Sequence, residues 1–150
     1  MPATPIARAT RLLGYAGLLP QLAAAGLVAS GRGEWFFFGR VLALVYGIVI
    51  LSFLGGIWWG FAVRRTVGQA RLAAVAVLPS LVGVALMIAT QFGLPLPWAL
   101  VALGSVVALT LLVDRRLART GDAPSGWMAL RVPLSLGLGG LTILTGILAA

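Results

Sequence analysis

Very few side chains in this sequence could do acid–base chemistry. The 150 residues include three acids, Glu34, Asp114 and Asp122, and neither His nor Cys. Without His and Cys the chain cannot hold a His-ligated haem, an iron–sulfur cluster, a zinc site of the usual kinds or a Ser-His-Asp triad. No Walker loop or dinucleotide-binding glycine fingerprint occurs, because the glycines lie inside apolar segments. The sequence therefore predicts a protein that is not an enzyme, with no catalytic residue, no metal site and no cofactor.

Asp114 is the ionisable residue for which a function is easiest to argue. It ends a long apolar run, and acids inside a membrane are costly and usually functional, for example in a proton relay or a ligand site. The alternative is an acid at the membrane boundary that pairs with Arg64, Arg115 or Arg131. We favour this ion pair, because nothing in the sequence places Asp114 at the middle of a bilayer.

Residues 55–60, Gly-Gly-Ile-Trp-Trp-Gly, form the densest motif of the chain. Small residues four positions apart let a second helix approach closely, and Gly56 and Gly60 have this spacing. The motif is either a docking face or pocket for a lipid-like or quinone-like tail, or ordinary packing within the protein's own bundle, which we favour. The helix-packing candidates are Gly55, Gly56 and Gly60. The ligand or ion-pair candidates are Trp58, Trp59, Asp114 and Arg131.

The composition indicates the kind of scaffold that holds these residues. Of all residues, 61% are hydrophobic and only 9% are charged, and the mean hydropathy is +1.08, whereas about a quarter of a soluble domain is charged. All eleven basic residues are Arg, and the formal charge is +8. Nucleic-acid binders carry a basic face on a soluble fold, but these arginines flank apolar runs. We expect them to contact anionic lipid headgroups, and we expect no nucleic-acid partner.

Apolar runs of about 20 residues, each long enough to cross a bilayer, divide the chain into five parts. We therefore predict one all-α domain over residues 1–150, a polytopic membrane helical bundle of about five transmembrane helices. The expected spans are about 12–30, 41–63, 72–90, 95–113 and 132–150. The first run could instead be a cleavable signal peptide, which would leave four spans, but it is long for one.

The arginines also predict the orientation. With five spans, the N-terminal tail and the loops after the second and fourth spans share one face, which carries nine Arg, whereas Arg32 and Arg40 lie on the other. Cytoplasmic loops carry the excess of Arg and Lys. We expect a cytoplasmic N-terminus, an outside C-terminus and a multi-pass protein of the bacterial inner membrane.

Several motifs of the chain occur together in a known family. They lie within residues 13–20, 46–60, 77–80, 114–116 and 127–134, and one of them, Ser-Phe-Leu-Gly-Gly-Ile at 52–57, is fairly specific. In these motifs the chain resembles, in order and over nearly its whole length, the bacterial domain-of-unknown-function family DUF3429, whose relatives include a small animal mitochondrial transmembrane protein. The resemblance implies an inner-membrane helical bundle without an established activity. Members often have His before the Trp-Gly pair, where this chain has Trp58, so no role of that His applies here.

The predicted function is a role that depends on helix packing. The chain has few groups for chemistry, little mass outside the expected spans and many small residues within them. We expect an accessory, assembly or stabilising subunit of a larger inner-membrane complex, respiratory or photosynthetic among others, or a homo-oligomer. The alternative is a carrier or binder of a small apolar or lipid-like molecule, with Trp58, Trp59 and Asp114 lining the site.

Overall fold

The computed structural model describes residues 7–150, and all regular structure in this range is helical. Five helical segments are long and apolar enough to cross a membrane, with the first two helices forming one segment, Arg8–Ala29. The predicted polytopic membrane bundle of five spans is confirmed. The helices are α1 (Arg8–Ala16), α2 (Leu19–Ala29), α3 (Gly33–Ala62), α4 (Gln69–Gln91), α5 (Leu96–Arg119) and α6 (Trp127–Leu148).

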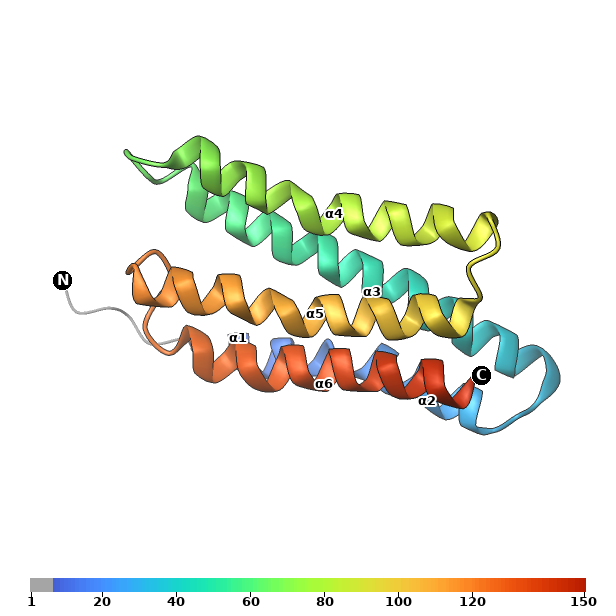
Figure 1. The fold of residues 1–150 in the computed structure, drawn as a ribbon. Coiled ribbons are helices and arrows are strands. Elements are labelled where there is room, and N and C mark those ends of the chain that lie inside the picture. The colour runs from blue at the N-terminus through green and yellow to red at the C-terminus, as the bar shows by residue number, and fades with distance from the viewer. Residues whose placement is uncertain (1–6) are drawn as a thin grey trace.

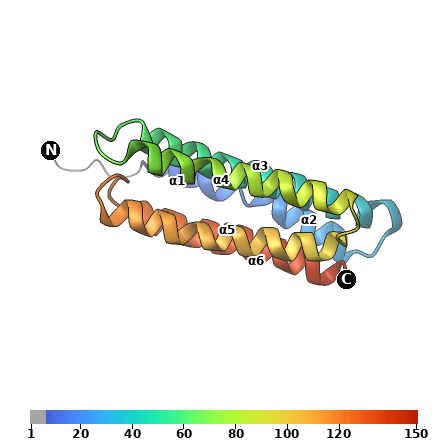
Figure 2. The ribbon, with the colours of Figure 1, turned by 45° about the horizontal axis from the view of Figure 1, so that its top comes forward.

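The bundle consists of two helical hairpins and a broken first span (Figure 1). One hairpin is α3 with α4 and the other is α5 with α6, and α2 packs against both α3 and α6. Figure 2 shows the two hairpins as separate layers. Helix α4 lies at the periphery, because it packs chiefly on α3 and only lightly on α5. The centre of the bundle is therefore formed by α2, α3, α5 and α6.

The arginine-rich segments gather at one end of the bundle. Figure 1 shows the start of α1, the loop from α3 to α4 and the loop from α5 to α6 at this end, and the remaining loops and the C-terminus at the other. These are the three segments that the sequence places on one membrane face. The structure contains no membrane, so the cytoplasmic location of this end stays a prediction.

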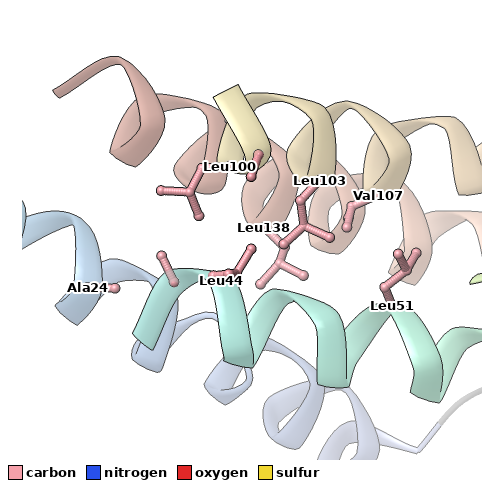
Figure 3. Packing of buried hydrophobic residues seen from close by; sticks show 9 residues of the cluster. Ala24, Leu44, Leu51, Leu100, Leu103, Val107 and Leu138 are labelled. Atoms are coloured by element: carbon pink, nitrogen blue, oxygen red, sulfur yellow. The ribbon is translucent and has the colours of Figure 1, made fainter. Parts of the chain in front are cut away.

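The core between the hairpins is filled by small and branched apolar side chains (Figure 3). Leu51 of α3 and Leu100 and Leu103 of α5 are completely buried. Between α5 and α6 even a methyl group would not fit. A Cβ on Gly104 would lie 2.5 Å from the carbonyl oxygen of Gly139, and a Cβ on Gly139 would lie 2.7 Å from that of Gly104. These two glycines let the backbones of α5 and α6 touch.

The first span, which the sequence predicts over about 12–30, is interrupted between two helices. Helix α1 ends at Ala16 and α2 begins at Leu19, with Pro20 in its first turn. Proline is tolerated in a first turn because it has no N–H to donate. The hydroxyl of Tyr46 on α3 donates a 2.6 Å hydrogen bond to the carbonyl of Gly17, so one carbonyl at the break finds a partner within the protein.

Two other helices begin earlier than the expected spans. Helix α3 begins at Gly33 and not near 41, because its aromatic start continues the helix beyond the apolar core; its 30 residues correspond to about 45 Å. Arg40 lies within α3 and stacks over Phe36, with its Cζ 5.4 Å from the ring centroid. Helix α6 begins at Trp127 and not near 132, after Gly126 with a φ of 77°, so Pro133 lies inside the helix.

An ion pair joins the two loops at the arginine-rich end. The Arg65 Nε donates a 2.7 Å hydrogen bond to Oδ1 of Asp122, and Nη2 of the same guanidinium and the hydroxyl of Thr120 donate to Oδ2. The hydrogen bond from Arg65, with a smaller contribution from Thr120, lowers the pKa of Asp122 from 3.8 to about 2. This contact ties the α3–α4 loop to the α5–α6 loop.

Adding one methyl group should separate the effects of the contacting and the open glycines. We expect Gly104→Ala to reduce the free energy of unfolding by about 1 to 3 kcal/mol, because the added Cβ meets backbone atoms that cannot move aside. A Cβ on Gly140 meets nothing within 4 Å, so Gly140→Ala should be neutral or stabilising. Unfolding of both variants by titration with sodium dodecyl sulfate measures the difference, and equal losses would contradict the described packing.

The Arg65–Asp122 pair should make stability depend on pH in acid. A carboxylate whose pKa is lowered by folding stabilises the folded state above its unfolded pKa, here near 3.8, and loses this contribution as pH falls through about 2. We therefore expect Asp122→Asn and Arg65→Gln to lower the melting temperature above about pH 5 and to converge with the unmodified protein near pH 2. Thermal unfolding in detergent from pH 7 to 2 tests this, and a pH-independent difference would exclude it.

Candidate functional site

The candidate site is a polar cluster buried between α3, α5 and α6 near the arginine-rich end. We define the polar cluster as Trp58, Thr110, Asp114, Trp127 and Arg131. Asp114 is completely buried and Arg131 is only 5% exposed. The last turns of α5 present Asp114, and the first turns of α6 present Trp127 and Arg131, which lie one helical turn apart on one face. The α5–α6 hairpin thus brings the acid and the base together.

The carboxylate of Asp114 receives hydrogen bonds at both oxygens. Nε of Arg131 donates to Oδ2 at 2.8 Å. The indole Nε1 of Trp58 donates to Oδ1 at 3.0 Å, and the indole Nε1 of Trp127 donates to the same oxygen at 3.2 Å. Three donors from two helices therefore surround one buried anion. Hydrogen bonds with an ionised partner are roughly twice as strong as those between neutral groups.

The guanidinium of Arg131 makes two further contacts besides its ion pair with Asp114. Its Nη2 donates to the hydroxyl of Thr110 at 3.4 Å, and its Cζ lies 5.9 Å from the ring centroid of Trp127. Phe61 of α3 packs edge-on against Trp127, with 5.6 Å between the ring centroids. An arginine over an indole face gains a cation–π attraction, which is larger when water is excluded. The polar cluster therefore fixes the position of the guanidinium from three sides.

These contacts favour an ion pair with a structural role over a catalytic carboxylate. An isolated charge in a low-dielectric interior is very unfavourable, so buried charges persist only where they are paired and hydrogen-bonded. Asp114 meets both conditions through Arg131 and the two indoles. Of the three arginines proposed from the sequence, Arg131 is the one that pairs with it. The polar cluster joins α3, α5 and α6 through its hydrogen bonds.

The four ligand or ion-pair candidates from the sequence do not all meet. Trp58, Asp114 and Arg131 lie together in the polar cluster, whereas Trp59 points away from it and is 48% exposed. Trp127 is a residue that sequence reasoning missed as part of the site. Its spacing of four residues from Arg131 was the available signal.

The three helix-packing candidates also divide. A Cβ on Gly55 would lie 2.4 Å from the carbonyl oxygen of Ala76 on α4, so Gly55 allows the close packing of α3 on α4. A Cβ on Gly56 or Gly60 would meet no atom within 4 Å. These two glycines do not serve contacts within the described chain, and their role in helix packing stays a prediction.

A second buried polar contact, which sequence reasoning missed, lies in the half of the bundle nearer the C-terminus. The side-chain Nε2 of Gln21 on α2 donates a 2.7 Å hydrogen bond to the hydroxyl of Thr142 on α6, and both residues are completely buried. This hydrogen bond and the polar cluster hold α6 at two levels. No group of three or more potential metal ligands occurs among residues 7–150.

Removing one charge of the pair should be far worse than removing both. Either Asp114→Leu or Arg131→Met leaves an unpaired buried charge, so each should lower the free energy of unfolding by about 3 to 5 kcal/mol. The double variant carries neither charge and should be more stable than either single variant. A double-mutant cycle measured by titration with sodium dodecyl sulfate checks this. Additive losses would show that the two charges do not stabilise each other.

Comparison with known proteins places the chain within a family but adds no activity. No curated protein and no solved structure matches it. The family model described as "Protein of unknown function (DUF3429)" matches residues 6–147, nearly the whole chain. The match includes the residues of the polar cluster and the glycines of α3. The chain therefore belongs to the DUF3429 family.

Proposed function

We propose that this protein is a non-enzymatic membrane subunit that stabilises or helps to assemble a larger inner-membrane complex through direct helix packing. The observation that carries the proposal is the contrast between two groups of glycines in the spans. One group is covered by neighbouring helices of the same chain, and Gly55, Gly104 and Gly139 are examples. Gly56 and Gly60 have the four-residue spacing that allows close helix packing, and they are left open.

The open glycines lie in the middle of an outward face of α3. We define the α3 docking face as Val49, Phe53, Gly56, Gly60 and Val63, whose spacing places them on one side of a helix. The three larger side chains are 54 to 63% exposed, and the two glycines are exposed as well. The two glycines place no side chain between the larger apolar side chains of this face, which suits the close approach of a helix from a partner protein.

The charge distribution supports the proposed orientation and lipid contacts. Eight of the eleven Arg in the chain belong to the arginine-rich end and lie outside the polar cluster, and anionic lipids of a cytoplasmic leaflet attract such clusters by about 1 kcal/mol per residue near the surface. With this end in the cytoplasm, the α3 docking face runs through the bilayer from Val49 near its middle to Val63 near the cytoplasmic boundary. The partner helix would therefore be a membrane span and not a soluble domain.

Larger side chains on the α3 docking face should release the partner without unfolding the protein. We expect the double variant Gly56→Leu/Gly60→Leu to lose a membrane partner that the unmodified protein retains in stoichiometric amount. The added side chains would keep a partner helix from approaching the α3 docking face closely. Co-purification in a mild detergent, followed by native mass spectrometry, identifies and counts the partner chains.

The matched control is Gly26→Leu/Gly140→Leu. These two glycines are equally open, but they lie on α2 and α6 and do not belong to the α3 docking face. The control should keep the partner. Loss of the partner in both double variants would mean that added bulk anywhere disturbs the assembly. Recovery of the protein alone, or only as a homo-oligomer, would overturn the proposal.

A further inference from the structure

A cavity of about 180 Å³ opens beside the polar cluster, on the side of the broken first span. We name it the lateral cavity. Four helices contribute to its wall, together with the break between α1 and α2. Representative wall residues are Gly14, Leu18, Phe53, Val107, Leu134 and Ser135. Trp58, Trp59 and Asp114, which the sequence suggested for a ligand site, are not among the lining residues, whereas Arg131 is.

The cavity opens towards lipid. Leu13 on α1 and Phe53 on α3 line it and are 75% and 63% exposed, and both lie in segments apolar enough to cross a membrane. Gly14 and Gly17 give the α1 side of the cavity no side-chain bulk. A long-chain molecule dissolved in the bilayer therefore reaches the cavity sideways, without passing through water.

Polar groups lie at the α6 side of this apolar space. Ser135 is 1% exposed, and its hydroxyl oxygen is buried without a hydrogen-bond partner. Arg131, one helical turn earlier on α6, is 5% exposed and also lines the cavity. A buried hydroxyl without a hydrogen-bond partner is unfavourable relative to a paired one. A ligand that brings one hydrogen-bonding oxygen to this side would remove that penalty.

The ion pair limits the charge that such a ligand can carry. Arg131 is already neutralised by Asp114, 2.8 Å away. An anionic headgroup placed here would add a charge without its own partner, in surroundings where unpaired charges are very unfavourable. A carbonyl or hydroxyl oxygen, in contrast, can bond with Ser135 without any change of charge. The site therefore suits a neutral polar group.

We propose that the lateral cavity binds a neutral long-chain molecule whose carbonyl or hydroxyl oxygen pairs with Ser135 beside Arg131. The apolar wall around Leu18, Val107 and Leu134 holds the part of the chain next to that oxygen. The volume is close to that of an engineered cavity of about 150 Å³ that binds benzene, so one ring or a short chain segment is enclosed and the remainder lies in the bilayer. The lateral cavity shares Phe53 with the α3 docking face, but Gly56 and Gly60 do not line it.

Photolabelling of the full chain in phosphatidylcholine nanodiscs tests the proposal. The probe is a long-chain alcohol that carries a diazirine near its hydroxyl, and peptide mass spectrometry locates the label. We expect labels on α6 next to Ser135 and on the residues of α1 and α3 that line the cavity. Hexadecanol and methyl palmitate should compete with the probe, whereas hexadecane and palmitate at neutral pH should compete poorly. Labels spread evenly over the outer surface would overturn the proposal.

Two variants of Ser135 separate the hydroxyl from the space. Ser135→Leu fills the cavity and should abolish the mapped labels. Ser135→Ala keeps the space and should weaken competition by hexadecanol about fivefold, the value expected for one lost hydrogen bond, with no change for hexadecane. The control is Ser105→Leu, because Ser105 is an exposed serine of a neighbouring helix, and it should label like the unmodified protein. Unchanged labelling in Ser135→Leu would refute the site even if the protein still binds its partner.

The oxygen could come from a free neutral lipid or from the ester carbonyl of a bilayer lipid, and the choice of nanodisc distinguishes them. Ether-linked phosphatidylcholine has no ester carbonyl. If the bilayer lipid is the occupant, labelling by the alcohol probe should rise when the ester lipid is replaced by the ether lipid. If a free lipid is the occupant, labelling should be the same in both nanodiscs. Either result supports the site and names its source.

Discussion

The pairing of Asp114 with Arg131 is the constraint on which the arrangement of the other helices depends. A buried charge of either sign would be intolerable alone, so α5 and α6 must meet in one register, with the carboxylate opposite Nε of the guanidinium. The indole of Trp58 then places α3 against the same carboxylate. The contact of Gly104 with Gly139 satisfies this register, because only glycine allows the two backbones to come so close.

The polar and apolar parts of the bundle divide the task of holding it together. Apolar packing in a membrane gives little preference for one neighbour over another, since lipid is as apolar as leucine. Hydrogen bonds and close backbone contacts therefore determine which helices become neighbours. The polar cluster around Asp114 does so near one end of the bundle, and the Gln21–Thr142 hydrogen bond does so nearer the other end. The peripheral helix α4 is placed differently, mainly by the close approach of Gly55 to its backbone.

The sequence was sufficient for the fold class and for part of the site, and the reasons are physical. Long apolar runs between arginines have a single solution in a bilayer, so five spans could be predicted. The sequence limited the partner of Asp114 to Arg64, Arg115 or Arg131, which all lie near the same boundary, but it could not select Arg131. The sequence could not show that Trp58 and not Trp59 joins them, since this depends on the rotation of α3. Nor could it show the break at Gly17, which relies on the hydroxyl of Tyr46 from a distant part of the chain, or the unpaired hydroxyl of Ser135.

The positions of Asp114 and Arg131 in the sequence also have a consequence for the biogenesis of the protein. Asp114 and Arg131 are separated by 17 residues of sequence, and the acid is synthesised first. Until the first turns of α6 lie against α5, the carboxylate of Asp114 lacks the cation that neutralises it in the folded protein and is unfavourable in lipid. We therefore expect α5 and α6 to leave the insertion machinery for the bilayer together, as one neutralised hairpin.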